Sequence, residues 1–117
     1  MKTSELTGAA LDWAVAKCDG ITVLPKMRGG HFVTLNRGET VLLCYSTDWA
    51  QGGPIIEREM ICIECVFHQA FWNAYTPAPE QPTGEAHAYG DTPLVAAMRC
   101  YVASKLGDEV ELPKGLL

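Results

Sequence analysis

The stretch DTPLVAAMRCYVASKLGD, residues 91–108, predicts the helix that organises the fold. Asp91 or Thr92 can cap its start, and Pro93 stands at the first helical position, where a missing N–H is tolerated. Gly107 is typical of the residue that ends such a helix. The apolar residues recur at helical spacing on one face: Leu94, Ala97, Met98, Tyr101, Val102 and Leu106. The C-terminal part of the chain is therefore expected to form an amphipathic helix that packs on other elements.

Residues 7–18 predict a second helix, with Thr7 at its start and Asp19-Gly20 after its end. Asn36-Arg37-Gly38 resembles a hairpin connection. The proline- and glycine-rich residues 77–91 are expected to form a long loop. Apolar runs between the helices predict strands at residues 21–24, 31–36, 39–46, 60–68 and 71–76. We therefore expect an α+β fold, in which an N-terminal and a C-terminal helix pack on a small, mainly antiparallel sheet.

The length and composition indicate one globular domain over residues 1–117. The chain has 48% apolar and 20% charged residues, and no apolar run approaches the roughly 20 residues that a membrane span requires. The N-terminal residues lack the uninterrupted apolar stretch of a signal peptide, so we expect a cytoplasmic protein. The five cysteines are then expected to be reduced thiols.

The net charge of −5 argues against general nucleic-acid binding, which usually needs a basic face. The nine lysines and arginines are scattered along the chain. They can still line one local pocket for an anion. The charge therefore excludes a protein that coats DNA, but it does not exclude the binding of a nucleotide-sized ligand.

Cys62, Cys65 and His68 have a spacing that can supply three zinc ligands, which His31 or Cys100 can complete. A structural zinc site normally has two ligand pairs, however, and a strand places Cys62 and Cys65 on opposite faces. No metal or other cofactor is therefore expected. The sequence also lacks the GxSxG, HExxH and P-loop motifs, so a binding protein is favoured over an enzyme.

The stretch TDWAQGGPIIERE, residues 47–59, contains the candidate ligand site. We expect an irregular loop here, because Gly52-Gly53-Pro54 fits poorly in a helix or a strand. Asp48 can accept hydrogen bonds from loop amides, and the paired glycines allow backbone amides to approach a ligand closely. The alternative is a rigid loop in which Trp49 fills the core.

An aromatic ring and several polar groups provide the parts of a nucleotide pocket. Trp49 can stack on a base, and Gln51 offers both a donor and an acceptor. Arg58 or Arg99 can add positive charge for a phosphate. The predicted ligand site therefore comprises Asp48, Trp49, Gln51, Gly52, Gly53, Pro54, Arg58 and Arg99.

Three blocks of the sequence resemble the NinX-like family of lambdoid phage and prophage proteins: KTSELTGAALDWAVAKCDG (2–20), STDWAQGGPIIERE (46–59) and DTPLVAAMRCYVASKLGDEVELP (91–113). The resemblance implies a phage accessory protein that acts in the bacterial host cytoplasm. It carries no catalytic residue, because none is assigned in the family. The matching positions are Leu6, Leu11, Asp12, Trp13, Asp48, Trp49, Gly52, Gly53, Pro54, Thr92, Pro93, Ala97, Arg99 and Tyr101.

Two functions remain open. The first is a non-catalytic binder of a small nucleotide-like anion, for example a host defence signal that the protein sequesters. Such a binder is often a homo-oligomer with shared pockets. The second is a protein-interaction module that modifies a host or phage complex, with Trp49 and Trp72 as its central contacts and an acidic rim. A cavity with convergent amides beside Trp49 favours the first, and a convex patch favours the second.

Overall fold

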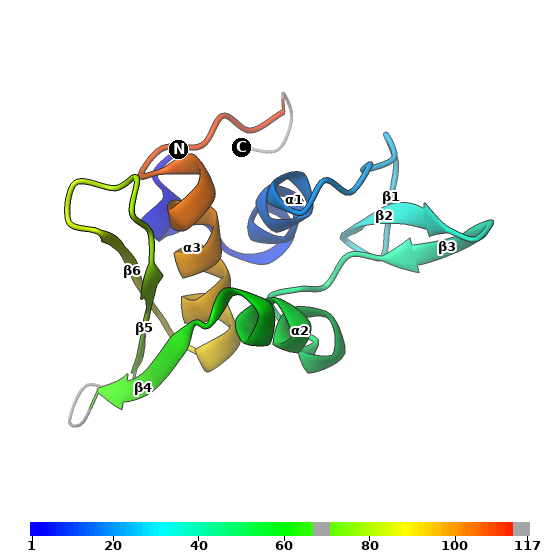
Figure 1. The fold of residues 1–117 in the computed structure, drawn as a ribbon. Coiled ribbons are helices and arrows are strands. Elements are labelled where there is room, and N and C mark those ends of the chain that lie inside the picture. The colour runs from blue at the N-terminus through cyan, green and yellow to red at the C-terminus, as the bar shows by residue number, and fades with distance from the viewer. Residues whose placement is uncertain (67–70, 114–117) are drawn as a thin grey trace.

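The computed structural model describes residues 1–66 and 71–113 of the chain, and Figure 1 shows how the elements are arranged. In chain order the elements are η1 (Thr3–Glu5), α1 (Gly8–Cys18), β1 (Met27–Arg28), β2 (His31–Asn36), β3 (Glu39–Leu42), α2 (Trp49–Glu59), β4 (Cys62–Val66), β5 (Phe71–Pro77), β6 (Glu85–Gly90) and α3 (Pro93–Leu106).

Helix α3 lies at the centre of the molecule, with the β4–β6 sheet on one side and α1 and α2 on the other (Figure 1). The Thr92 hydroxyl caps the helix by accepting a hydrogen bond from the Val95 N–H at 3.1 Å. Gly107 follows its end with a φ of 81°, which a residue with a side chain rarely adopts. The predicted C-terminal helix is therefore confirmed, including both of its ends.

The strands form two antiparallel sheets, in the orders β1-β2-β3 and β4-β5-β6. The turn between β2 and β3 has positive φ at Arg37 and Gly38, which confirms the predicted hairpin connection. This hairpin extends away from α3, whereas the second sheet packs on it (Figure 1). The predicted α+β class is confirmed, with the N-terminal and C-terminal helices flanking small antiparallel sheets.

Residues 85–90 form strand β6, so the prediction of a loop over residues 77–91 is wrong for this part. The inward-facing residues of β6 are Ala86, Ala88 and Gly90, which are small and carry little hydrophobic signal. Small residues are needed because α3 lies very close. A Cβ added at Gly90 would lie 2.5 Å from the Ala96 nitrogen. The packing distance, which the local sequence does not show, explains the composition of the strand.

Residues 21–24 are not a strand, so this prediction is also wrong. The segment lies beside β2 and makes isolated hydrogen bonds in place of a ladder. The Leu24 N–H donates to the Val33 carbonyl at 2.9 Å, and the Thr34 hydroxyl donates to the Thr22 carbonyl at 2.6 Å. Pro25 follows directly and has no N–H with which to continue the pairing.

Residues 49–59 form helix α2, which corrects the prediction of an irregular loop. Asp48 supplies a strong start signal, because its carboxylate accepts the Ala50 N–H at 2.9 Å. Pro54 has no N–H to donate to the Ala50 carbonyl, and Gly52 and Gly53 disfavour helix. Burial of Ile55 and Gly52 against the rest of the molecule offsets these costs. Tertiary packing therefore decides the conformation of this stretch.

In the part of the chain that the structure describes, no helix combines the length and apolar character that a membrane crossing requires. The N-terminal residues lie beside the segment that follows α3, where the Thr3 N–H donates to the Asp108 carbonyl at 2.8 Å. An isolated bridge joins Lys2 and Glu109. The N-terminus is thus tied to the segment after α3.

Candidate functional site

Trp49 stands at the first position of α2, and its side chain is 55% exposed. The Asp48 cap fixes the direction in which the helix leaves the preceding turn. That turn is itself held by the Cys44 carbonyl, which accepts the N–H groups of Thr47 and Asp48 at 3.1 and 2.8 Å. The indole is therefore held at the surface by a rigid turn and does not fill the core.

A cavity of about 240 Å³ lies beside this indole, where the N-terminus of α2 meets the N-terminus of α3. We call it the Trp49 groove; its lining residues are Ser46, Thr47, Trp49, Thr92, Pro93 and Leu94. Helix N-termini expose N–H groups and carry partial positive charge. Within residues 1–66 and 71–113, the backbone N–H groups of Trp49 and Leu94 have no hydrogen-bond acceptor. The groove thus lies beside an exposed aromatic ring and two helix N-termini.

Ser46 forms the buried side of the groove and connects it to α1. Its N–H donates to a carboxylate oxygen of Asp12 at 2.8 Å, and both residues are almost fully buried. Burial raises the pKa of Asp12, while hydrogen bonding to Ser46 and the charge of His31 oppose the rise. Through this hydrogen bond, Asp12 of α1 positions Ser46, which forms the buried wall of the groove.

Gly52 and Gly53 have different surroundings, and neither lines the Trp49 groove. A Cβ on Gly52 would lie 2.6 Å from the Tyr45 carbonyl oxygen and 2.6 Å from a methyl carbon of Leu94. A Cβ on Gly53 would meet nothing within 4 Å. Gly52 is therefore explained by close helix packing. Inside α2, neither glycine forms the loop of amides that the sequence suggested.

Gln51 braces α2 against the strand that precedes it. Its side-chain amide donates to the Leu42 carbonyl at 2.7 Å, and its oxygen accepts the Cys44 N–H at 2.7 Å. At the end of β3, the Gln51 side chain thus makes the two backbone hydrogen bonds that a neighbouring strand would otherwise make. These bonds use one N–H and the oxygen of the amide that was expected to recognise a ligand.

The two arginines of the predicted site lie away from the groove and make intramolecular bonds. Arg58 lies about 14 Å along α2 from Trp49 at the usual helical rise. It pairs with Asp19 at 2.7 Å and with Glu59 at 2.9 Å. Arg99 donates to the carbonyls of Leu6 and Tyr89 at 2.7 and 2.9 Å, and burial lowers its pKa.

Of the predicted residues, the structure therefore brings Trp49 alone to the lining of the groove, with Asp48 directly before it as the cap of α2, and places the others elsewhere along α2 and α3. It adds Ser46 and Thr47 from the turn, and Thr92, Pro93 and Leu94 from α3. The helix start at Thr92-Pro93 was visible in the sequence. Its position opposite Trp49 was not, because it depends on how α2 and α3 pack.

Cys44 and His31 form a second polar pair, with the thiol sulfur 3.6 Å from the imidazole Nδ1. Burial raises the pKa of the Cys44 thiol, and the charges of Asp12 and Asp48 raise it further. A thiol with a raised pKa stays protonated at neutral pH and is a poor nucleophile. The pair therefore does not provide the activated thiol that nucleophilic catalysis needs.

Cys62 and Cys65 both lie in β4, three positions apart, so they point to opposite faces of the sheet. This alternation opposes joint coordination of a metal ion by the two thiols. His68, the third residue of that spacing, lies outside the described residues. Among the described residues, no group of three His, Cys, Asp or Glu side chains is placed to hold a metal ion.

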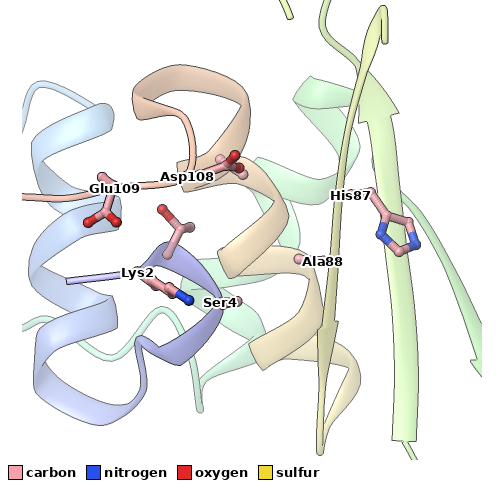
Figure 2. Close-up of a pocket in the computed structure, with 8 residues that line it drawn as sticks. Lys2, Ser4, His87, Ala88, Asp108 and Glu109 are labelled. Atoms are coloured by element: carbon pink, nitrogen blue, oxygen red, sulfur yellow. The ribbon is translucent and has the colours of Figure 1, made fainter. Parts of the chain in front are cut away.

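Several hollows in the described part of the chain are larger than the groove, and two of them include residues from the N-terminal half. One of about 430 Å³ lies between the β2–β3 hairpin and the segment after α1, and no charged side chain lines it. The other, of about 290 Å³, lies where the N-terminal residues meet the segment after α3. Figure 2 shows Lys2 and Ser4 there with Asp108 and Glu109, while His87 points to the other side of β6. Neither hollow combines an exposed aromatic ring with free helix N–H groups.

Comparison with known proteins places the chain in a phage family. A crystal structure at 2.0 Å of a phage protein from Bacillus cereus ATCC 14579 has a similar fold, with a TM-score of 0.65 and 12% identity. The match covers 89% of this chain and 92% of that one, and at this identity it shows the fold alone. No curated protein matches the chain. The family model described as Bacteriophage P22, NinX matches residues 2–105, so the chain belongs to the NinX family, as its sequence predicted.

Proposed function

We propose that this protein binds a small nucleotide-like anionic ligand in the Trp49 groove and does not turn it over. The observation that carries the proposal is the exposed Trp49 ring beside a cavity at which two helices begin. An exposed indole offers a stacking surface for a base, and helix N-termini favour anions.

The two ends of such a ligand would lie on different helices. The base would stack on Trp49 at the start of α2. The Asp48 carboxylate caps that helix and repels an anion there. The first turn of α3 contains no acidic residue, and the Leu94 N–H is free within the described residues. We therefore expect the phosphate to bind at α3.

The size of the groove limits how much of the ligand it can enclose. Small-molecule sites usually have volumes of roughly 300–1,000 Å³. A cavity of about 240 Å³ holds one part of a nucleotide and leaves the rest outside. We propose that a second copy of the chain covers the remainder, which makes the binder a homo-oligomer.

Membership of a phage family supports a role during infection. A binder that removes a nucleotide-like defence signal from the host cytoplasm needs a rigid pocket and no catalytic group. The Asp48 cap and the Thr92 cap provide such rigidity at both sides of the groove.

The test is native mass spectrometry of the protein purified from phage-infected bacterial cells, repeated after denaturation. We expect a small molecule that is released on denaturation and absent from the Trp49→Ala variant. Gly53→Ala is the matched control, because it changes the same helix away from the groove. Retention of the molecule by Trp49→Ala, with equal occupancy, would place the site elsewhere.

A protein-interaction module is the second candidate, and the exposure of Trp49 favours it as well. A large exposed aromatic residue is typical of the central contact in an interface. Trp72, the other predicted contact, is partly buried against the core. If the folded protein carries no small molecule and Trp49→Ala weakens a defined complex, this second function replaces the first.

A further inference from the structure

The β4–β6 sheet has one face against α3 and one face open to solvent (Figure 1). In β6 the residues that face α3 are buried, and the alternate residues Glu85, His87 and Tyr89 are exposed. The register pairs His87 with Tyr75 and Tyr89 with Asn73, so these side chains share the open face. We call this the outer face; its rings are Phe71, Tyr75, His87 and Tyr89, and its carboxylates are Glu64 and Glu85.

The rings of the outer face hold one another in place. Tyr89 contacts Phe71 edge to face, with the ring centres 5.2 Å apart, and it contacts His87 in the same way at 4.7 Å. Tyr89 is nevertheless 52% exposed. Rings ordered by such contacts lose little conformational freedom when a partner covers them. The cluster is therefore a preformed surface.

A hollow of about 330 Å³ lies at one end of the outer face, between Met60, Tyr75 and Glu85. Met60 ends α2 in the left-handed conformation, with a φ of 54° and a ψ of 46°, and its side chain is 71% exposed. Glycine or asparagine usually occupies such a position. A strained residue that exposes a long apolar side chain next to a hollow points to a contact surface, since methionine adapts well to partners.

The charge of the outer face is negative. Among the described residues it has two carboxylates and no lysine or arginine. Cys62 and then Glu64 raise the pKa of the Tyr75 hydroxyl, and Glu85 contributes as well. This rise is what a negatively charged environment causes. Asn73 donates to Glu64 at 2.9 Å, while its buried side-chain oxygen has no partner within the described residues. The face therefore offers acceptors and aromatic rings.

We propose that the outer face docks a basic segment of a partner protein, whose arginine or lysine side chains lie over the exposed rings and pair with the two glutamates. Cations bind the faces of aromatic rings, and arginine also pairs with carboxylates through two parallel hydrogen bonds. This site is separate from the Trp49 groove and does not depend on it.

An open sheet with exposed rings is also used to stack the bases of single-stranded nucleic acid. That use requires positive charge beside the rings to hold the phosphates. The outer face has carboxylates at those positions, and the whole chain has a net charge of −5. The charges therefore favour a basic protein segment.

The test is an NMR titration of the full, 15N-labelled chain with a synthetic peptide of alternating arginine and serine. A glutamate–serine peptide and single-stranded oligothymidine serve as comparison ligands. We expect the arginine peptide to shift the amide signals of β4, β5 and β6, and the comparison ligands to leave them unchanged. Glu64→Gln combined with Glu85→Gln should weaken peptide binding about tenfold, in line with two exposed ion pairs beside aromatic rings.

The matched control combines Glu39→Gln with Glu111→Gln, which removes the same charge from exposed positions off the outer face. It should change the affinity less than about twofold, because distant exposed charges are screened. Tyr89→Leu keeps an apolar residue and removes the ring; we expect a fivefold loss, about the weaker end of a cation–π contact.

Three results would overturn the proposal. The peptide could bind nowhere on the chain at low salt. The control pair could weaken binding as much as the outer-face pair, in which case only the overall charge attracts the peptide. Oligothymidine could shift the outer-face signals more strongly than the peptide, in which case the face binds nucleic acid. Circular dichroism of each variant confirms that the titrated chain is folded.

Discussion

Gly52 and Gly53 are neighbours in α2, and an added methyl group meets opposite surroundings at the two positions. At Gly52 it would lie 2.6 Å from the Tyr45 carbonyl oxygen, well inside the van der Waals contact of about 3.5 Å. The obstacle is backbone, which cannot rotate away as a side chain can. At Gly53 the methyl group would meet nothing within 4 Å. Replacing glycine by alanine should therefore lower the stability of the fold at position 52 and raise it at position 53.

The magnitudes follow from packing and helix propensity. Overpacking at a buried position costs about 1–3 kcal/mol, and alanine regains about 0.5–1 kcal/mol of helix propensity over glycine. Gly52→Ala should therefore destabilise the fold by about 1–2 kcal/mol. Gly53→Ala should stabilise it by about 0.5–1 kcal/mol. For a chain of this size the midpoint of thermal unfolding moves by roughly 4 °C per kcal/mol.

The assay is urea unfolding followed by far-ultraviolet circular dichroism, with the slope of the transition compared between variants. Equal slopes show that the two variants unfold from similarly compact states. If Gly53→Ala lowers the free energy of unfolding, residue 53 is not in an open helical position. If Gly52→Ala has no effect on the free energy of unfolding, α2 does not pack closely against Leu94 and Tyr45.

Three more predictions concern the contacts that hold α2 and α3. Gln51→Ala removes both hydrogen bonds from α2 to the backbone of Leu42 and Cys44 and should cost about 1.5–3 kcal/mol in urea unfolding; Gln51→Glu, whose carboxylate would face the Leu42 carbonyl oxygen, should not recover the lost stability. Arg99→Met keeps the apolar length but leaves two carbonyls without their donor, and should cost about 2 kcal/mol by the same measurement; a loss below that of Arg99→Lys would contradict this role. Hydrogen bonding to Arg58 lowers the pKa of Glu59 below its ordinary 4.5. The stabilisation from Glu59 is thus present above that value and is lost as the pH falls through the lowered pKa, so the stability of Glu59→Gln should depend less on pH in this acidic range.

Local signals predicted the elements whose ends are defined by neighbouring residues. Thr92, Pro93 and Gly107 define α3, and Arg37-Gly38 defines the hairpin turn. Each of these signals acts over a few residues through a hydrogen bond or a permitted backbone angle. The structure therefore agrees with the sequence at these points.

Elements that depend on distant contacts were not predictable in this way. The Gly52-Gly53-Pro54 run disfavours helix locally, yet α2 forms because Ile55 is buried against the rest of the molecule. Strand β6 has alanine and glycine on its inner face because α3 passes close to it. In both cases the residue types depend on how closely distant segments pack, and this cannot be read from a single sequence.

The sequence by itself determined the α+β class, the helices at both ends of the chain and membership of the NinX family. It also indicated Trp49 as a candidate ligand-binding residue. Only the tertiary structure decided that Trp49 lies beside the start of α3, that Arg58 and Arg99 bond within the chain, and that aromatic rings gather on the outer face. The physical reason is range: caps and periodicity act within a few residues, whereas a groove or a sheet face forms where distant segments pack together.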